Sequence, residues 1–221
     1  MNKPGARPAG KVSNEWSPEL AYAVGLLASD GNLSKDGRHI DFTSTDRELV
    51  ETFKRCLGLI TKIGTKKNGA GGKLAFRTQF GDVLFYRWLV KIGLHPNKSK
   101  TLGRLNIPRD LFFDFLRGYF DGDGTIYSYW DPRWHSSFMF YSAFTSASKP
   151  FLEWLRDEIE ILSGVRGRIE KASGALQLKF AKTTTRTLFA RMYYSKTMPH
   201  LRRKFTKAEE IFRIDEAHQR E

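Results

Sequence analysis

Two aspartates, Asp30 and Asp123, stand 93 residues apart, and each is followed directly by a glycine. Each ends the same pattern, an apolar stretch with a glycine five residues before the acid, Gly25 in one copy and Gly118 in the other. Carboxylates are preferred ligands of hard cations such as Mg²⁺, and a metal ion held by carboxylates can support phosphodiester hydrolysis. The matched spacing therefore indicates a duplicated unit in which each copy contributes one acid.

Two helices should position these acids. Ser17 and Pro18 favour a helix start, and the apolar run leads from there to about Asp30, where Gly31 is expected to end the helix in the left-handed conformation. A second helix is predicted from Asp110 to Asp121. An interior glycine costs about 1 kcal/mol relative to alanine, so close approach of the other helix should compensate at both motif glycines.

Packing of these helices about a pseudo-two-fold axis would place the two acids side by side. Their mutual repulsion, near the negative ends of two helix dipoles, would then be relieved by a divalent cation. One Asp-Gly pair would be an ordinary helix end. Two at matched positions favour a paired site, and Asp121, which occurs only in the second copy, is a possible auxiliary acid.

The rest of the chain repeats with the motif. Phe42-Thr43-Ser44 reappears as Phe144-Thr145-Ser146, and Leu74 to Phe80 reappears as Leu176 to Lys182, beginning 32 residues after the phenylalanine in both copies. The predicted fold class is α+β, with two αββαββα units, each holding a four-stranded antiparallel saddle-like sheet, packed through the motif helices. The predicted parts are a basic arm (1–16), a first unit (17–101), a linker (102–109), a second unit (110–205) and a C-terminal helix (206–221). A glycine-rich hairpin tip (68–72) is expected in the first unit, and nine additional residues lengthen the first hairpin of the second (127–138).

The charge balance limits the partner. With 37 Lys and Arg against 24 Asp and Glu, the 221-residue chain carries a formal charge of +13, which points to nucleic acid or, less directly, to an anionic membrane surface. No basic amphipathic helix supports the membrane alternative, and the longest apolar run is too short to span a bilayer. The single cysteine, Cys56, excludes an intrachain disulfide and a cysteine zinc site, and a buried, inert thiol is expected.

A curved sheet can lie along a DNA groove, with most basic residues on phosphates. The candidate DNA contacts are polar or basic residues of the predicted sheets and of the strand-to-helix corners: Arg38, Thr43, Arg47, Arg77, Gln79, Arg133, Thr145, Lys149, Arg168 and Lys179. The aromatic residues of the longer hairpin (Tyr127, Tyr129, Trp130 and Trp134) could belong either to the core or to this surface.

The paired glycine-and-acid helices, the repeat and the charge resemble the LAGLIDADG homing endonuclease family in its single-chain form, over residues 17–204. The resemblance implies a monomer that cuts long asymmetric DNA sites with Mg²⁺ and leaves short 3′ overhangs. Mn²⁺ is expected to substitute, Ca²⁺ to bind without cleavage, and no small-molecule cofactor is expected. An intracellular enzyme, intron-encoded or free-standing rather than an intein, is the expected context.

The resemblance also assigns residues. Asp30 and Asp123 would be the catalytic metal-binding acids, with Ser29 and Gly122 completing the metal site, and Gly25 and Gly118 would form the helix interface. One lysine is expected at each acid, Lys98 and Lys204, with Lys100 and Arg203 as alternatives. An RNA maturase that assists intron splicing, or a DNA-binding protein that does not cut, remains a second interpretation of the same fold.

Overall fold

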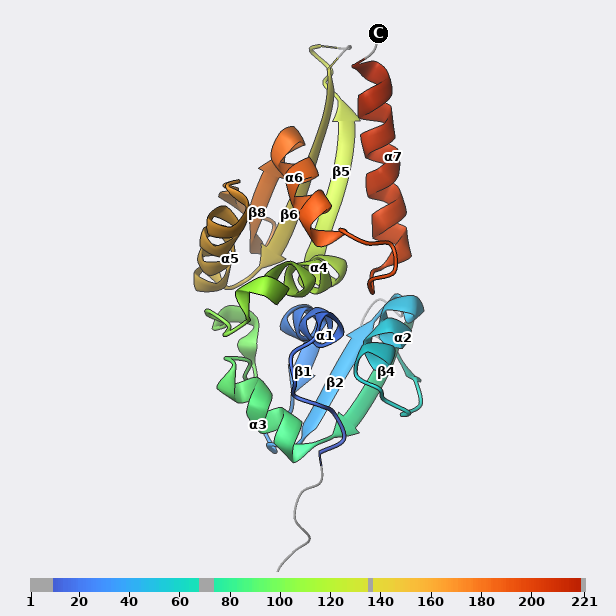
Figure 1. The fold of residues 1–221 in the computed structure, drawn as a ribbon, viewed down its shortest axis with the longest axis vertical. Helices are drawn as coiled ribbons and strands as arrows, with labels where there is room; N and C mark the ends of the chain where they lie inside the picture. Colours follow the sequence, from blue (N-terminus) through green and yellow to red (C-terminus); the bar gives the residue numbers. More distant parts are fainter. Residues whose placement is uncertain (1–9, 68–73, 135–136, 220–221) are drawn as a thin grey trace, which may run out of the picture.

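The computed structural model describes residues 10–67, 74–134 and 137–219, and it confirms the α+β class. Two four-stranded antiparallel sheets have equivalent strand orders, β1-β2-β4-β3 and β5-β6-β8-β7. Helices α1 and α4 lie side by side between the sheets, at the centre of the molecule (Figure 1). The described residues include no helix that is long and apolar enough to cross a membrane.

The elements follow the duplicated order. The first unit holds α1 (Pro18–Ser29), β1 (Gly31–Leu33), β2 (His39–Ser44), α2 (Arg47–Cys56), β3 (Gly64–Lys67), β4 (Leu74–Gly81), α3 (Val83–Lys91) and the 3₁₀ turn η1 (Lys98–Lys100). The second holds the 3₁₀ turn η2 (Arg109–Leu111), α4 (Phe112–Asp123), β5 (Gly124–Trp130), β6 (Phe138–Ser146), α5 (Lys149–Ser163), β7 (Arg168–Ala172), β8 (Ala175–Ala181), α6 (Lys182–Met192) and α7 (Arg202–His218). Helix α7 extends along β5 (Figure 1).

The two central helices touch at their interior glycines. A Cβ atom on Gly25 would lie 2.1 Å from the carbonyl oxygen of Phe115, and one on Gly118 would lie 2.0 Å from that of Tyr22. These distances are far below van der Waals contact, so only glycine permits the observed approach of the backbones. The ordinary cost of a helical glycine is thereby offset by packing between the helices.

The two glycines that follow the acids do not adopt the left-handed conformation that was predicted for Gly31. Gly31 is absent from the glycines with positive φ, and Gly124 is extended with φ −83° and ψ 159°. The chain passes directly from each helix into a strand, and no left-handed cap forms. A Cβ on Gly31 would lie 2.7 Å from the Leu27 carbonyl oxygen, and one on Gly124 would lie 2.5 Å from that of Phe120. Glycine is required here for close packing against the last helical turn.

The two sheets pair in equivalent ways, but the chain between the paired strands differs in length by two residues. Phe42 lies opposite Thr78 in the first sheet, whereas Phe144 lies opposite Leu178 in the second. The separation is therefore 36 residues in one unit and 34 in the other, so β8 corresponds to β4 at an offset of 100, and the predicted match of Leu74 with Leu176 is wrong by two residues. A shift of two keeps every side chain on its face, so the hydrophobic pattern is the same in either register.

Several boundaries also differ. Helix α4 ends at Asp123 rather than Asp121, and α7 begins at Arg202 rather than at residue 206, because no glycine or proline interrupts its periodic buried positions, Lys204, Ala208, Ile211 and Asp215. Residues 10–16 of the predicted arm pack on the first unit, where the Lys11 amide donates to the Asp82 carboxylate at 2.5 Å. The predicted hairpin tip lies outside the described residues.

The first hairpin of unit one is short. Strand β1 ends at Leu33, because the Asp36 carboxylate accepts hydrogen bonds from the Arg38 and His39 amides at 3.0 Å and closes a turn there, with Gly37 at φ 72°. In the second unit, β5 continues to Trp130. The two hairpins therefore differ in length, as the nine additional residues predicted.

Candidate active site

The two acids lie at equivalent helix ends that meet. Asp30 follows α1 directly, and Asp123 is the last residue of α4. A Cβ on Gly122 would lie 3.2 Å from Asp30 Oδ2 and 2.0 Å from the Ser29 hydroxyl oxygen, so the end of one helix rests against the other. Both carboxylate residues remain exposed to solvent. The fold thus presents two neighbouring carboxylates on an accessible surface.

The carboxylates repel each other. Crowding by protein atoms and the charge of Asp123 raise the pKa of Asp30 to about 6, although Lys204 and Lys98 oppose the shift. Burial likewise raises the pKa of Asp123, against the same two lysines. Both side chains still reach solvent, so protein surrounds them on most sides and leaves one side open. A site of this kind favours a bound cation over two protons or two uncompensated charges.

Each acid has a buried lysine beside it. Lys98 Nζ donates to the carbonyl oxygens of Gly31 at 2.5 Å and Ser29 at 3.4 Å. Lys204 Nζ donates to the carbonyl oxygens of Gly124 at 2.6 Å, Gly122 at 3.0 Å and Phe120 at 2.7 Å. Since Ser29 and Gly31 correspond to Gly122 and Gly124 at the motif offset, the two ammonium groups occupy equivalent places.

These lysines satisfy carbonyl groups that the helix ends would otherwise leave unpaired, and they face the negative ends of both dipoles. Burial lowers the pKa of Lys98, and it lowers that of Lys204 to about 8, while the neighbouring aspartates oppose both shifts. An ammonium group with a pKa of about 8 is still mostly charged at neutral pH. The carboxylates therefore have a fixed positive counterpart on each side.

The start of α7, which carries Lys204, is held on α4 by buried polar contacts. Asp121 accepts a hydrogen bond from the Leu201 amide at 2.7 Å, and the Tyr22 and Tyr193 hydroxyls also donate to it at 2.7 and 2.9 Å. Asp121 is 1% exposed, and burial raises its pKa. Both oxygens of its carboxylate accept hydrogen bonds inside the protein. Asp121 therefore helps to position Lys204.

The donor set suits a hard cation that also binds substrate. Within the described ranges, no three His, Cys, Asp or Glu side chains gather as a metal site. Mg²⁺ is commonly held by one or two carboxylates, with water and substrate phosphates as its other ligands. Gly122 can offer only its backbone carbonyl, whereas Ser29 can offer its carbonyl and also the lone pairs of its hydroxyl, which donates to the Leu26 carbonyl at 2.9 Å. Two open carboxylates therefore fit such a cation if phosphates supply the remaining oxygens.

The predicted DNA contacts divide by location. Strand alternation and register place Thr43, Arg77 and Gln79 on one face of the first sheet, opposite the buried Phe42. Thr145, Lys179 and Arg168 share the corresponding face of the second sheet. The other candidates are exposed at strand or helix ends and in the long hairpin: Arg38, Arg47, Lys149 and Arg133.

Most of these cations already have acidic partners. The shortest distances are 2.8 Å for Arg47 with Glu51, 3.3 Å for Lys149 with Glu153, 3.1 Å for Arg77 with Asp41, 3.0 Å for Arg133 with Asp131 and 3.2 Å for Lys179 with Glu170. Ion pairs at a surface contribute little to stability, about 0–1 kcal/mol. A phosphate can therefore replace the carboxylate at small cost in the exposed pairs, whereas Arg77 is held by a buried carboxylate, that of Asp41.

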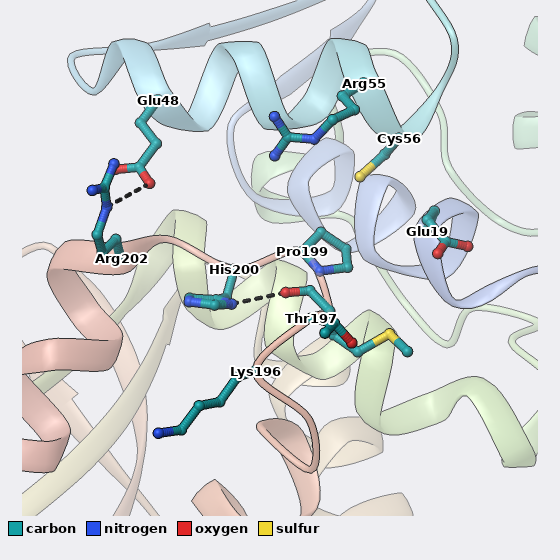
Figure 2. Close-up of a pocket in the computed structure, with 10 residues that line it drawn as sticks. Glu19, Glu48, Arg55, Cys56, Lys196, Thr197, Pro199, His200 and Arg202 are labelled. Atoms are coloured by element: carbon teal, nitrogen blue, oxygen red, sulfur yellow. Dashed lines mark hydrogen bonds and ion pairs between the residues drawn. The ribbon is translucent and has the colours of Figure 1, made fainter.

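Sequence reasoning missed the contacts between the units at α7. Arg203 Nε lies 3.3 Å from Asp46, and Arg202 Nε lies 3.4 Å from Glu48 at the start of α2. A cavity of about 520 Å³ opens beside this contact, between α2 and residues 196–202 (Figure 2). Basic side chains in the first turn of a helix carry no sequence signal of which acids they will meet across the molecule.

Cys56 faces this cavity (Figure 2). The reactivity of its thiol can therefore be used to test how well the folded protein protects it. Burial raises the pKa of the Cys56 thiol to about 12. Since an unfolded cysteine has a pKa of about 8.5, the native thiolate fraction at pH 8 should be lower by roughly a thousandfold. We expect native protein to react with iodoacetamide at least a hundred times more slowly than protein in denaturant, as measured by mass spectrometry. Equal rates would show that the thiol is not protected.

The first unit matches a known sequence family. Residues 17–87 match the LAGLIDADG-like domain. Over 109 residues, 49% of this chain, the sequence is 30% identical to a subunit of the A-type ATP synthase from Methanopyrus kandleri. The match spans only 10% of that protein, so it describes a segment and not that protein as a whole.

Solved structures share the whole arrangement. The LAGLIDADG meganuclease I-AabMI bound to uncleaved DNA aligns with a TM-score of 0.63, covering 92% of each chain at 14% identity. I-SmaMI, bound to uncleaved DNA target in the presence of calcium ions, aligns with a TM-score of 0.59, covering 93% of this chain and 92% of that chain at 14% identity. Full-length DUF199/WhiA from Thermatoga maritima aligns with a TM-score of 0.57, covering 94% of this chain and 69% of that chain at 14% identity.

These likenesses extend to both sheets and both central helices. At 14% identity the structural matches show the fold alone. The sequence match to a family model is limited to the first unit. The resemblance drawn from the motifs is thus confirmed at the level of fold. The chain has the two-unit LAGLIDADG fold, and residues 17–87 of its first unit match the LAGLIDADG-like domain.

Proposed function

We propose that this protein is a site-specific double-strand DNA endonuclease that acts as a monomer with a divalent cation, Mg²⁺ in the cell. The observation that carries the proposal is the meeting of two exposed carboxylates at equivalent helix ends, each beside a buried lysine on equivalent carbonyls. Two equivalent acids suit two phosphodiesters, one on each strand of a duplex. The short 3′ overhangs implied by the resemblance belong to the same proposal, as does action inside the cell, where DNA is the partner.

The chain's own groups have distinct parts in this proposal. A bound cation would activate water and stabilise the leaving oxygen at the scissile phosphate. Asp30 and Asp123 hold the cation, and their open side admits the phosphate. Lys98 and Lys204 fix the backbone on which the acids stand, and their charge favours the ionised carboxylates. The polar faces of the two sheets supply phosphate and base contacts on either side of the cut.

A randomised long-duplex library incubated with Mg²⁺ tests the proposal. Double-strand cuts at one recurring sequence are the expected result, with no cuts in Ca²⁺. A second candidate is a DNA-binding protein without cleavage, favoured by the occurrence of the same fold in DUF199/WhiA, whose name states no nuclease activity. That candidate predicts enrichment of one sequence without any cutting. Neither cutting nor enrichment would direct attention to RNA, as in the maturase interpretation.

Lys98→Met and Lys204→Met should lower the cleavage rate by roughly ten- to a hundredfold, the range expected when a group that orients a metal ligand is removed. Methionine fills a similar volume but leaves the helix-end carbonyls unpaired, and loss of the charge should raise the pKa of Asp30 and Asp123 further. Single-turnover rates measured across pH would report this as an optimum moved to higher pH. Lys100→Met, at the exposed end of η1, is the matched control. An effect of Lys100→Met equal to that of Lys98→Met would contradict the assignment.

A further inference from the structure

Three tyrosines form a row on the second sheet. Tyr127 and Tyr129 lie on β5, and Tyr141 lies on β6 directly opposite Tyr127. The Tyr141 ring centroid is 5.6 Å from that of Tyr127 and 6.2 Å from that of Tyr129, with interplanar angles of 27° and 16°. We call these three residues the tyrosine row. Stacking fixes their rings together, so the row is more rigid than three separate side chains.

The row lies on the face proposed for DNA. Ile126 and Phe140 point into the core, with 2% and 0% exposure, so their neighbours along the strands point to the other face. That face also carries Thr145 and Lys179. The tyrosines are intermediate or exposed, and Tyr129 is 43% exposed. A large aromatic surface is thus available where the sheet is polar elsewhere.

The ring faces inside the row are already occupied. They stack on one another, and Lys179 Nζ lies 4.5 Å from the Tyr141 centroid and 5.7 Å from the Tyr127 centroid. Glu170 holds this ammonium group from the other side at 3.2 Å. A base therefore cannot insert between Tyr141 and either neighbour without dismantling the row. The edge carbons of a tyrosine ring are apolar, and Tyr129 is exposed enough to offer them to a ligand.

The first unit has no counterpart of the row among its described residues. Its hairpin ends before those positions, because β1 stops at Leu33, whereas β5 runs to Trp130. Its face presents hydrogen-bonding groups instead, where Asp41 accepts from Asn32 Nδ2 and Arg77 Nη2, both at 3.1 Å, and Gln79 is exposed beside them. The two sheets thus offer different chemistry to the two halves of a target.

We propose that the tyrosine row recognises thymines in the half-site bound by the second unit, through apolar contact with their 5-methyl groups in the major groove, whereas the first unit recognises its half-site by hydrogen bonds. This rests on the DNA-binding part of the proposed function. The thymine methyl is the apolar group that distinguishes base pairs in that groove. Tyr127 and Tyr129 lie three and five residues after Gly124. At about 3.3 Å per residue, the row is roughly 10–17 Å from the acids, or about three to five base pairs at 3.4 Å per step.

Binding in Ca²⁺ to duplexes containing deoxyuridine tests this, because uracil lacks only the methyl group. A target is first selected from a randomised library with the full chain. Thymines in each half are then replaced in turn, and dissociation constants are measured. We expect about a fourfold weaker affinity for each contacted thymine in one half, three to five base pairs from the centre, and no comparable effect in the other half.

Variants assign the effect to the row. Tyr129→Phe should keep the penalty for uracil, since the ring edge is retained, and Tyr129→Ser should abolish it at one position. Gln79→Ala, the matched control in the first unit, should weaken binding of the other half and leave the penalty intact. Melting temperatures of the Tyr129 variants should stay close to that of the parent, because the residue is exposed.

Equal affinity for thymine and uracil throughout, absence of thymine from the selected sites, or a set of uracil penalties that Tyr129→Ser leaves unchanged at every position would each overturn the inference and leave sequence-specific binding standing. If no duplex is enriched at all, the proposed function fails and the inference fails with it.

Discussion

Asp30→Asn and Asp123→Asn each lower the rate of double-strand cleavage by at least about a thousandfold, equivalent to about 4 kcal/mol of activation free energy. Asparagine keeps the shape of the side chain and removes the charge that holds a hard cation. The fold should survive, because crowding and the charge of Asp123 raise the pKa of Asp30, and loss of either charge relieves their repulsion. DNA affinity in Ca²⁺ should change by no more than a few fold.

Single-turnover cleavage of the selected target, with nicked and linear products resolved separately, measures this. Asp110→Asn is the matched control, since it makes the same change of charge at an exposed position in η2. Retention of full double-strand cleavage in either variant would remove that acid from the site. Nicking of one strand by only one variant would mean that the two copies no longer act equivalently.

Gly118→Ala lowers the free energy of unfolding by about 3 kcal/mol, at the upper end of overpacking costs. In an ordinary helix the same change stabilises by about 1 kcal/mol, so the sign is the test. The new methyl would meet the Tyr22 carbonyl oxygen at 2.0 Å, and that oxygen belongs to the backbone of α1. The two helices must separate, which also moves Asp30 relative to Asp123.

Thermal unfolding gives the readout, with an expected fall in melting temperature of roughly 6–12 °C for a chain of this size. Gly103→Ala is a suitable control, because a Cβ there meets nothing within 4 Å. A melting temperature equal to or above that of the parent would contradict the close approach of the helices. Gly25→Ala should behave like Gly118→Ala, since its Cβ would meet the Phe115 carbonyl oxygen at 2.1 Å.

The duplicated fold could be read from the sequence because its signals are local. Helix periodicity, the Ser17 cap and strand alternation each depend on a few neighbouring residues, and their recurrence at a fixed offset doubles the signal. The approach of two helices at Gly25 and Gly118 followed from the cost of an interior glycine. The nearness of Lys98 and Lys204 to the helix ends came from family resemblance, because a buried lysine looks the same as a surface one in sequence.

Features that depend on contacts between distant segments could not be predicted from the sequence. Tyr22 and Asp121 look like a core residue and a second acid, and only the packing of α1 on α4 brings the hydroxyl to the carboxylate at 2.7 Å. Gly31 could have formed a left-handed cap or packed closely against the last helical turn, depending on the side to which the chain turns. A glycine is compatible with both, so the sequence does not distinguish them. The ion pairs made by most of the basic residues among the predicted DNA contacts are similarly absent from any local pattern.

The two-residue difference between the units, in the chain that separates the paired strands, limits how the proposed DNA recognition could be re-engineered. A residue copied from β4 to β8 by aligning the two repeats in sequence would arrive two positions from its structural equivalent. Two residues of strand span about 6.6 Å, close to two base-pair steps. In the proposed complex with DNA, side chains transplanted in this way would contact the wrong bases while the protein folded normally. Grafts between the halves should therefore follow the pairing of Phe42 with Thr78 and of Phe144 with Leu178, which makes Gln79 the counterpart of Lys179.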